Sequence, residues 1–137
     1  MALNLSPEKG VKLTKKDRAH VLKKMKQGWK ATCLVPDYVF DENGDIQIAS
    51  DKNRRIVRIL KFKDDGIHIE KALKSRTLRI PWNKITEINK SKEMKTGLEI
   101  KMIDGKYISF SVYNSYKYQQ NMEFIANYIA NKCNGTH

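Results

Sequence analysis

The segment Arg79-Ile-Pro-Trp-Asn-Lys-Ile85 is the part of this chain whose pattern says most about the fold. It begins with the alternation of polar and apolar residues that is typical of a β-strand with one buried face. Pro81 ends that strand, because proline cannot donate a ladder hydrogen bond. Trp82 follows directly, and Ile85 and Ile88 continue the apolar pattern. We expect Trp82 to close the open end of a small β-barrel, with its indole N–H bonded to a partner.

The same period of two recurs on both sides of this segment, with turn signals between the runs. The turn signals are Asn43-Gly44, Asp64-Asp65-Gly66 and Asp104-Gly105, which suit tight connections between antiparallel strands. The alternating apolar positions are Leu60 and Phe62, Ile67 and Ile69, Leu78 and Ile80, Leu98, Ile100 and Met102, and Ile108, Phe110 and Val112. Residues 38–112 are therefore expected to form seven or eight short strands of an antiparallel sandwich or barrel.

A helical period replaces the strand period after residue 114. Residues 115–132 contain neither glycine nor proline, and they place Tyr118, Met122, Ile125 and Ile129 on one helical face. This apolar face predicts a C-terminal helix that packs on the sheet.

A second helix is predicted near the N-terminus, at about residues 14–28. Thr14 can cap its start, with Asp17 at the position of a capping box, and Gly28 marks its end. Its narrow apolar face consists of Val21, Leu22, Met25 and Trp29.

These elements give a mainly β (α+β) fold, an antiparallel sandwich or partly open barrel that is capped by the C-terminal helix. We expect a basic N-terminal arm at residues 1–36, irregular over 1–13, a β-rich domain at 37–133 and a short tail at 134–137. The segment from Lys30 to Pro36 is compatible with either a strand or a linker.

The order of about seven antiparallel strands followed by one amphipathic helix resembles that of pleckstrin-homology (PH) domains. The residues that match the bacterial PH-like families best are Gly66–Glu70, the segment Arg79–Ile85 with Ile88, Leu98–Ile100, Asp104–Phe110 and the helix. The resemblance covers roughly the last 80 residues and implies a non-enzymatic binding or assembly module. Ligands of such domains include phosphoinositides, peptides and other proteins, so the fold does not choose among them.

The charge of the chain favours anionic partners. Lys and Arg number 27 against 15 Asp and Glu, a net charge of +12, and residues 1–36 alone hold nine basic and two acidic residues. Nucleic acid, acidic phospholipid and acidic protein surfaces are all attracted by such charge. A role in keeping the protein soluble would explain the excess of basic residues equally well. The candidate anion-binding residues of the predicted N-terminal helix are Lys15, Lys16, Arg18, Lys23, Lys24 and Lys26.

A second candidate anion site lies on the predicted strands. Lys63, Lys74 and Arg76, with Lys61 and Arg79 nearby, fit the loose basic pattern with which PH domains bind phosphoinositides. Acidic residues interrupt the pattern and would oppose an anion.

Enzyme, metal and cofactor chemistry find little support in the sequence. No two of His20, His68 and His137 stand at metal-ligand spacing, Cys33 and Cys133 form no Cys-x-x-Cys pair, and no glycine-rich phosphate loop occurs. A calcium loop at residues 41–52 lacks the required glycine and the final glutamate. A cyclic-dinucleotide motif that begins at Arg54 and Arg58 lacks its glycine, since Met94 stands there. We expect a non-enzymatic protein without cofactor or metal.

Protein contact is the function that the sequence favours most. Tyr107, Tyr113, Tyr116 and Tyr118 cluster between the last strand and the last helix, and tyrosine is enriched at contact surfaces. We therefore expect a cytoplasmic adaptor with reduced cysteines and no transmembrane segment, which binds a protein or assembles with itself. The alternative is a basic module for nucleic acid or acidic phospholipid.

Overall fold

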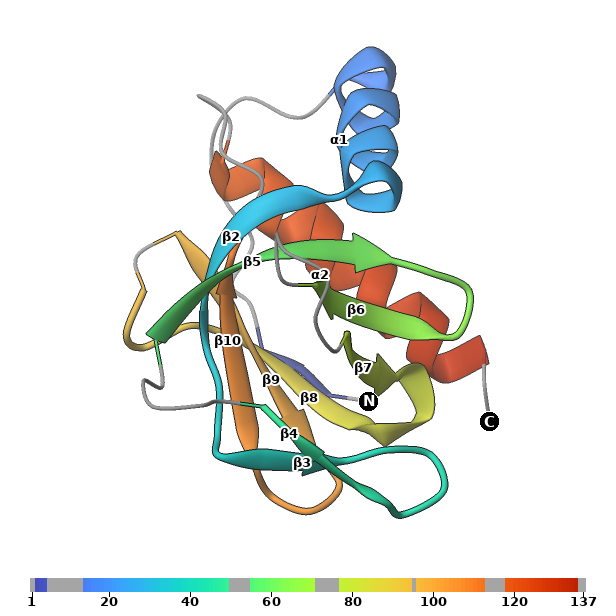
Figure 1. The fold of residues 1–137 in the computed structure, drawn as a ribbon. Helices are drawn as coiled ribbons and strands as arrows, with labels where there is room; N and C mark the ends of the chain where they lie inside the picture. The colour runs from blue at the N-terminus through green and yellow to red at the C-terminus, as the bar shows by residue number, and fades with distance from the viewer. Residues whose placement is uncertain are drawn as a thin grey trace.

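The computed structural model describes residues 2–4, 14–49, 55–70, 77–94, 96–112 and 118–135. Within them an eight-stranded sheet, a separate two-stranded hairpin and two helices share one hydrophobic core (Figure 1). The mainly β architecture expected from the sequence is confirmed.

The strands follow the predicted alternation closely. The large sheet consists of β1 (Ala2–Asn4), β2 (Trp29–Leu34), β5 (Arg55–Phe62), β6 (Gly66–Glu70), β7 (Leu78–Pro81), β8 (Ile85–Lys90), β9 (Gly97–Met102) and β10 (Tyr107–Ser111). The small hairpin consists of β3 (Tyr38–Phe40) and β4 (Ile46–Ile48). A 3-10 turn, Trp82–Lys84, joins β7 to β8.

The sheet is built from two antiparallel meanders that meet at its centre. Its order is β1-β8-β9-β10-β2-β5-β6-β7, so β2 joins the C-terminal strands to the middle ones. From β8 to β7 every pairing is antiparallel, and these seven strands curl into a half-barrel (Figure 1). This half-barrel fits the PH-like architecture that the sequence resemblance implied.

Two segments of the first 36 residues belong to the sheet. The segment from Lys30 to Pro36, open between strand and linker in the sequence, supplies the central strand β2, which pairs with β5 and β10. Residues 1–13 were expected to be irregular, but Ala2–Asn4 form β1, which pairs in parallel with β8. Three residues are too few for periodicity to reveal a strand.

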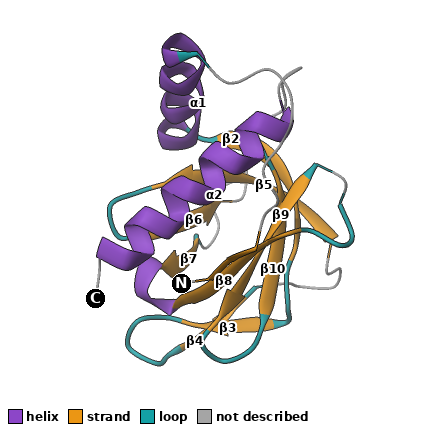
Figure 2. Cartoon of the chain, turned by 180° about the vertical axis from the view of Figure 1, so that it is seen from behind, coloured by secondary structure: helices purple, strands orange, loops and turns teal. Residues whose placement is uncertain are grey.

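The helix α2 (Tyr118–Gly135) runs across the curled sheet (Figure 2). Met122, Ile125 and Ile129 of the predicted apolar face are buried in the core. This face therefore closes the half-barrel on one side.

The helix α1 (Lys15–Gln27) has the ends that the sequence predicts. Thr14 accepts a hydrogen bond from the Asp17 amide, and the Asp17 carboxylate accepts one from the Thr14 amide, which completes the capping box. Gly28 ends the helix with a positive φ of 106°, and its N–H bonds the Lys24 carbonyl. Val21 and Met25 are buried, so α1 is packed on the domain.

Trp82 makes the indole hydrogen bond expected from the sequence. Its side chain is fully buried, and its indole N–H donates to the carbonyls of Lys63 and Asp64, each at 3.1 Å. The ring packs edge-on against Phe62 and Tyr128. Trp82 thereby ties the turn after β5 to the start of β8.

Gly66 shows why a glycine opens β6. A Cβ at this position would lie 2.1 Å from the Ile80 carbonyl oxygen, and its φ is +155°. Backbone approaches of this kind require glycine.

Candidate functional site

The β3–β4 hairpin stands outside the large sheet and has two unlike faces. On its inner face Val39 is fully buried, and its cross-strand partner Gln47 reaches the edge strand β7. The Gln47 side-chain amide donates to the Arg79 carbonyl at 3.1 Å and accepts from the Arg79 N–H at 3.2 Å. The hairpin is therefore fixed to the domain through this face.

The outer face of the hairpin is apolar and open to solvent. It carries two cross-strand pairs, Tyr38 with Ile48 and Phe40 with Ile46. The exposed fractions are 38% for Tyr38, 37% for Phe40, 63% for Ile46 and 59% for Ile48. Among the described residues, the other exposed large apolar side chains are Val57, Ile103 and Tyr107. We call the four hairpin side chains the hairpin face.

The two aromatic rings of the hairpin face hold an ammonium group. Lys106 Nζ lies 3.9 Å from the ring centre of Tyr38 and 5.6 Å from that of Phe40. Its hydrogen bond with Tyr38 raises the pKa of Lys106 above its ordinary value. The Asp104 carboxylate lies 3.6 Å from Lys106 Nζ and balances its positive charge. The rings are thus already placed to bind a lysine side chain.

Sequence reasoning identified the hairpin but missed this face. Tyr38-Val39-Phe40 is apolar at every position, so both faces of β3 are apolar and one of them has no place in the core. The alternation of Ile46-Gln47-Ile48 opposite β3 selects which side chains share each face. These two patterns identify the two faces of the hairpin, but they do not say which face is buried.

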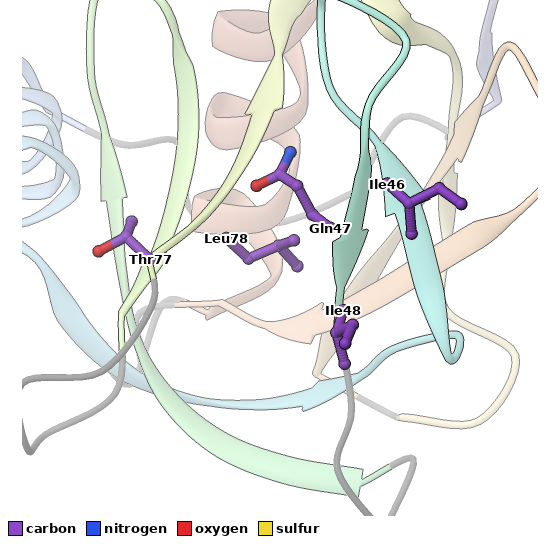
Figure 3. A pocket seen from close by; sticks show the side chains of 5 residues that line it. All are labelled: Ile46, Gln47, Ile48, Thr77 and Leu78. Carbon is purple, nitrogen blue, oxygen red and sulfur yellow. The ribbon is translucent and has the colours of Figure 1, made fainter.

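A pocket of about 270 Å³ lies between β4 and β7, lined by Ile46, Gln47, Ile48, Thr77 and Leu78. Figure 3 shows Gln47 pointing from β4 toward Leu78, while Ile46 points away. These lining residues include no titratable side chain. Such a pocket suits an apolar contact better than acid–base chemistry.

The structure gathers the predicted basic residues of α1 on one exposed helix. Lys15, Lys16, Arg18, Lys23 and Lys26 are exposed, and Lys24 is half-buried. With Asp17, α1 holds six basic residues and one acidic residue. This helix lies at the end of the molecule opposite the β3–β4 hairpin in both views (Figures 1 and 2).

The predicted anion site on the strands is only partly tested. Lys61 and Arg79 flank His68 across β5, β6 and β7, and Lys63 is exposed at the following turn. Lys74 and Arg76 lie outside the described residues.

Acidic side chains oppose an anion at this place. Lys61 Nζ is 2.9 Å from a Glu70 carboxylate oxygen, and His68 bonds Asp65 at 2.8 Å. Burial acts to raise the pKa of Asp65, but the hydrogen bond and the charge of His68 outweigh it and lower that pKa. Asp65 therefore stays ionised at neutral pH.

One tyrosine of the predicted contact cluster is placed. Tyr107 is 43% exposed, with Lys101 Nζ 5.7 Å from its ring centre. Tyr113 and Tyr116 lie outside the described residues, and Tyr118 begins α2 with its side chain outside them as well.

Cys33 and Cys133 are buried thiols that are not joined in a disulfide. Burial raises the pKa of Cys33 and that of Cys133 to about 12 each, so neither supplies a thiolate at neutral pH. Within the described ranges, no three His, Cys, Asp or Glu side chains gather as a metal site would require. The described helices include none long and apolar enough to cross a membrane.

Comparison with known proteins gives a structural neighbour but no family. No family model matches the chain, and no curated protein matches it. The structure is similar to that of Inner Membrane Complex sub-compartment protein 3 from Toxoplasma gondii, with a TM-score of 0.59 and 11% sequence identity. The match covers 91% of this chain and 89% of the other. At this identity the likeness concerns the fold alone.

Proposed function

We propose that this chain is a non-enzymatic PH-like binding module that engages a protein through the hairpin face. The proposal retains the sequence-based prediction of a bacterial PH-like adaptor. It assigns the protein contact to Tyr38, Phe40, Ile46 and Ile48 instead of the predicted tyrosine cluster. One observation carries it: a hairpin outside the barrel turns four large apolar side chains to solvent on one face.

Physical chemistry supports this use of the face. A small hairpin that only connects β2 to β5 gains nothing from exposing two aromatic and two isoleucine side chains, because polar residues would be better solvated. Contiguous apolar patches of a few hundred Å² on soluble domains commonly mark contact sites. The inner face is fixed by Val39 and Gln47, so the outer face is presented in a defined orientation.

Site-specific photo-crosslinking tests the proposal. With benzoylphenylalanine at Phe40, we expect a discrete adduct in an extract of the source cells. The double substitution Ile46→Ser with Ile48→Ser should remove most of that adduct, by about tenfold, since it strips the apolar contact. The same photo-probe at exposed Lys92 is the matched control. Equal labelling at Lys92, or an adduct that persists in the double variant, would refute the role of the hairpin face.

A second candidate function is anion binding by α1, which its exposed basic residues favour. Phosphate contacts release counterions, so this binding must weaken steeply as salt rises. The helix lacks stacking aromatics among its own residues, which favours contacts to charge over reading of bases.

Titration with duplex DNA, single-stranded RNA and anionic vesicles distinguishes the two functions. If α1 binds phosphates, affinity should fall by at least tenfold between about 50 and 200 mM salt. Lys16→Gln with Lys23→Gln should then weaken binding, whereas Lys90→Gln with Lys92→Gln should not. Absence of binding at the lower salt would leave the hairpin face as the functional surface.

A further inference from the structure

The hairpin and α1 carry opposite charges at opposite ends of the molecule. Residues 37–49 hold four acidic residues and no basic one, in a chain whose net charge is +12. Asp37, Glu42 and Asp45 are exposed, and Asp41 is half-buried where it bonds the turn amides of Asn43 and Asp45. The helix α1 carries six basic residues and one acidic residue. Charges of opposite sign therefore lie on the hairpin and on α1, at opposite ends of the molecule (Figure 1).

We infer that the hairpin face binds α1 of a second copy of this chain, so that copies associate head to tail. This rests on the proposed function, because it names the partner of the same face. The acidic rim of the hairpin would meet the exposed lysines of α1, and the apolar face would cover their aliphatic stems.

The aromatic pair shows that this face is compatible with lysine side chains. Tyr38 and Phe40 lie edge to face, with ring centres 5.6 Å apart, and Lys106 already packs on them. Because the charge of Lys106 is balanced by Asp104, the four hairpin carboxylates are left to attract a second set of cations. Exposed lysines spaced by one or two helical turns, such as Lys16 and Lys23, suit this surface.

Charge also disfavours a symmetric dimer in which two copies meet through the same face. A symmetric contact of hairpin face with hairpin face would bring two sets of four carboxylates together, which is repulsive. At about 150 mM salt the screening length is about 8 Å, so the distant positive charges of two copies repel weakly while contacts across the interface persist.

The size of the face sets the expected strength. It offers on the order of a few hundred Å², less than the roughly 800 Å² per partner of stable complexes. We therefore expect a dissociation constant between about 10 µM and 1 mM. A head-to-tail contact uses two different surfaces, so each added copy leaves a free end. The average mass should continue to rise beyond that of a dimer as concentration increases.

Sedimentation of the full chain and two blocked variants tests the inference. The hairpin variant carries Ile46→Ser with Ile48→Ser, and the helix variant carries Lys16→Glu with Lys23→Glu. At about 150 mM salt, each variant alone should associate at least tenfold more weakly than the wild type. An equimolar mixture should form a one-to-one dimer, because the helix variant retains its hairpin and the hairpin variant retains its helix.

Matched variants control for charge and for folding. Lys90→Glu with Lys92→Glu changes the net charge as the helix variant does, but at exposed positions elsewhere, and should not weaken association. If the hairpin variant no longer unfolds cooperatively, a second variant, Glu42→Gln with Asp45→Asn, replaces it. This second variant weakens the contact of the hairpin by removing charge alone.

Three results would overturn the inference: a wild type that stays monomeric up to about 500 µM, a helix variant that associates as strongly as the wild type, or a mixture of the two variants that stays monomeric. If the wild type is monomeric and the probe at Phe40 captures a protein of another mass, the proposed function survives without this inference. If both experiments fail, both proposals fall.

Discussion

Removing residues 1–30 is expected to abolish cooperative folding. The deletion takes away Val21, Met25 and Trp29, which are 3%, 0% and 6% exposed. Burial of each such side chain contributes about 1.5–3 kcal/mol, and the total stability of a domain this size is about 5–15 kcal/mol. The deletion also shortens the central strand β2 and leaves the Ser111 carbonyl without the Trp29 indole N–H, which bonds it at 3.0 Å.

Circular dichroism during urea titration measures this effect. A chain that starts at residue 14 is the matched control, because it keeps α1 with its buried side chains and should retain a cooperative transition. Lys16→Gln with Lys23→Gln should also unfold as the wild type does, since both side chains are exposed. If the chain from residue 31 unfolds cooperatively, α1 is an attached arm and its buried side chains are dispensable.

Trp82→Ala is expected to cost about 3–5 kcal/mol of the free energy of unfolding. The ring is 1% exposed and packs edge-on against Phe62 and Tyr128, which also stack on each other, so the cavity it leaves would be lined by large side chains that cannot easily collapse. Its loss also frees two carbonyls in the turn that follows β5.

Trp82→Phe separates packing from hydrogen bonding. Phenylalanine keeps most of the buried ring but donates no hydrogen bond, so this variant should lose roughly 1–2 kcal/mol. Ile103→Ala, at a 60% exposed turn position, should stay within about 0.5 kcal/mol of the wild type. The measurement is the urea midpoint by circular dichroism at constant slope. A loss below 1 kcal/mol for Trp82→Ala would show that the barrel end closes without the indole.

Both predictions bear on how the hairpin face and α1 are used. The strand β2 is packed into the core, and it connects α1 at one end of the molecule to the hairpin at the other (Figure 1). Substitutions on the exposed sides of these two elements therefore test binding, whereas substitutions at Val21, Met25 or Trp82 test stability. The effect of a substitution on association can therefore be separated from its effect on folding.

Local sequence patterns predict most of the individual helices and strands. The period of two placed β5, β6, β7, β9 and β10, the Asn43-Gly44 turn signal placed the β3–β4 hairpin, and the period of 3.6 placed both helices. Gly66 and Gly105 marked two further turns. Thr14 and Gly28 set the ends of α1 within one residue. These features depend on the backbone preferences of a few neighbouring residues, so they are legible without the rest of the chain.

The way in which these elements combine depends on long-range packing. This packing has three consequences that the local patterns do not show. It placed Trp29–Leu34 at the centre of the sheet, paired Ala2–Asn4 with β8, and turned the Val39 side of the hairpin inward. Alternation shows which side chains share a face, but remote segments determine which face meets the core. The exposed hairpin face, and its separation from α1 by the length of the molecule, follow from that long-range packing.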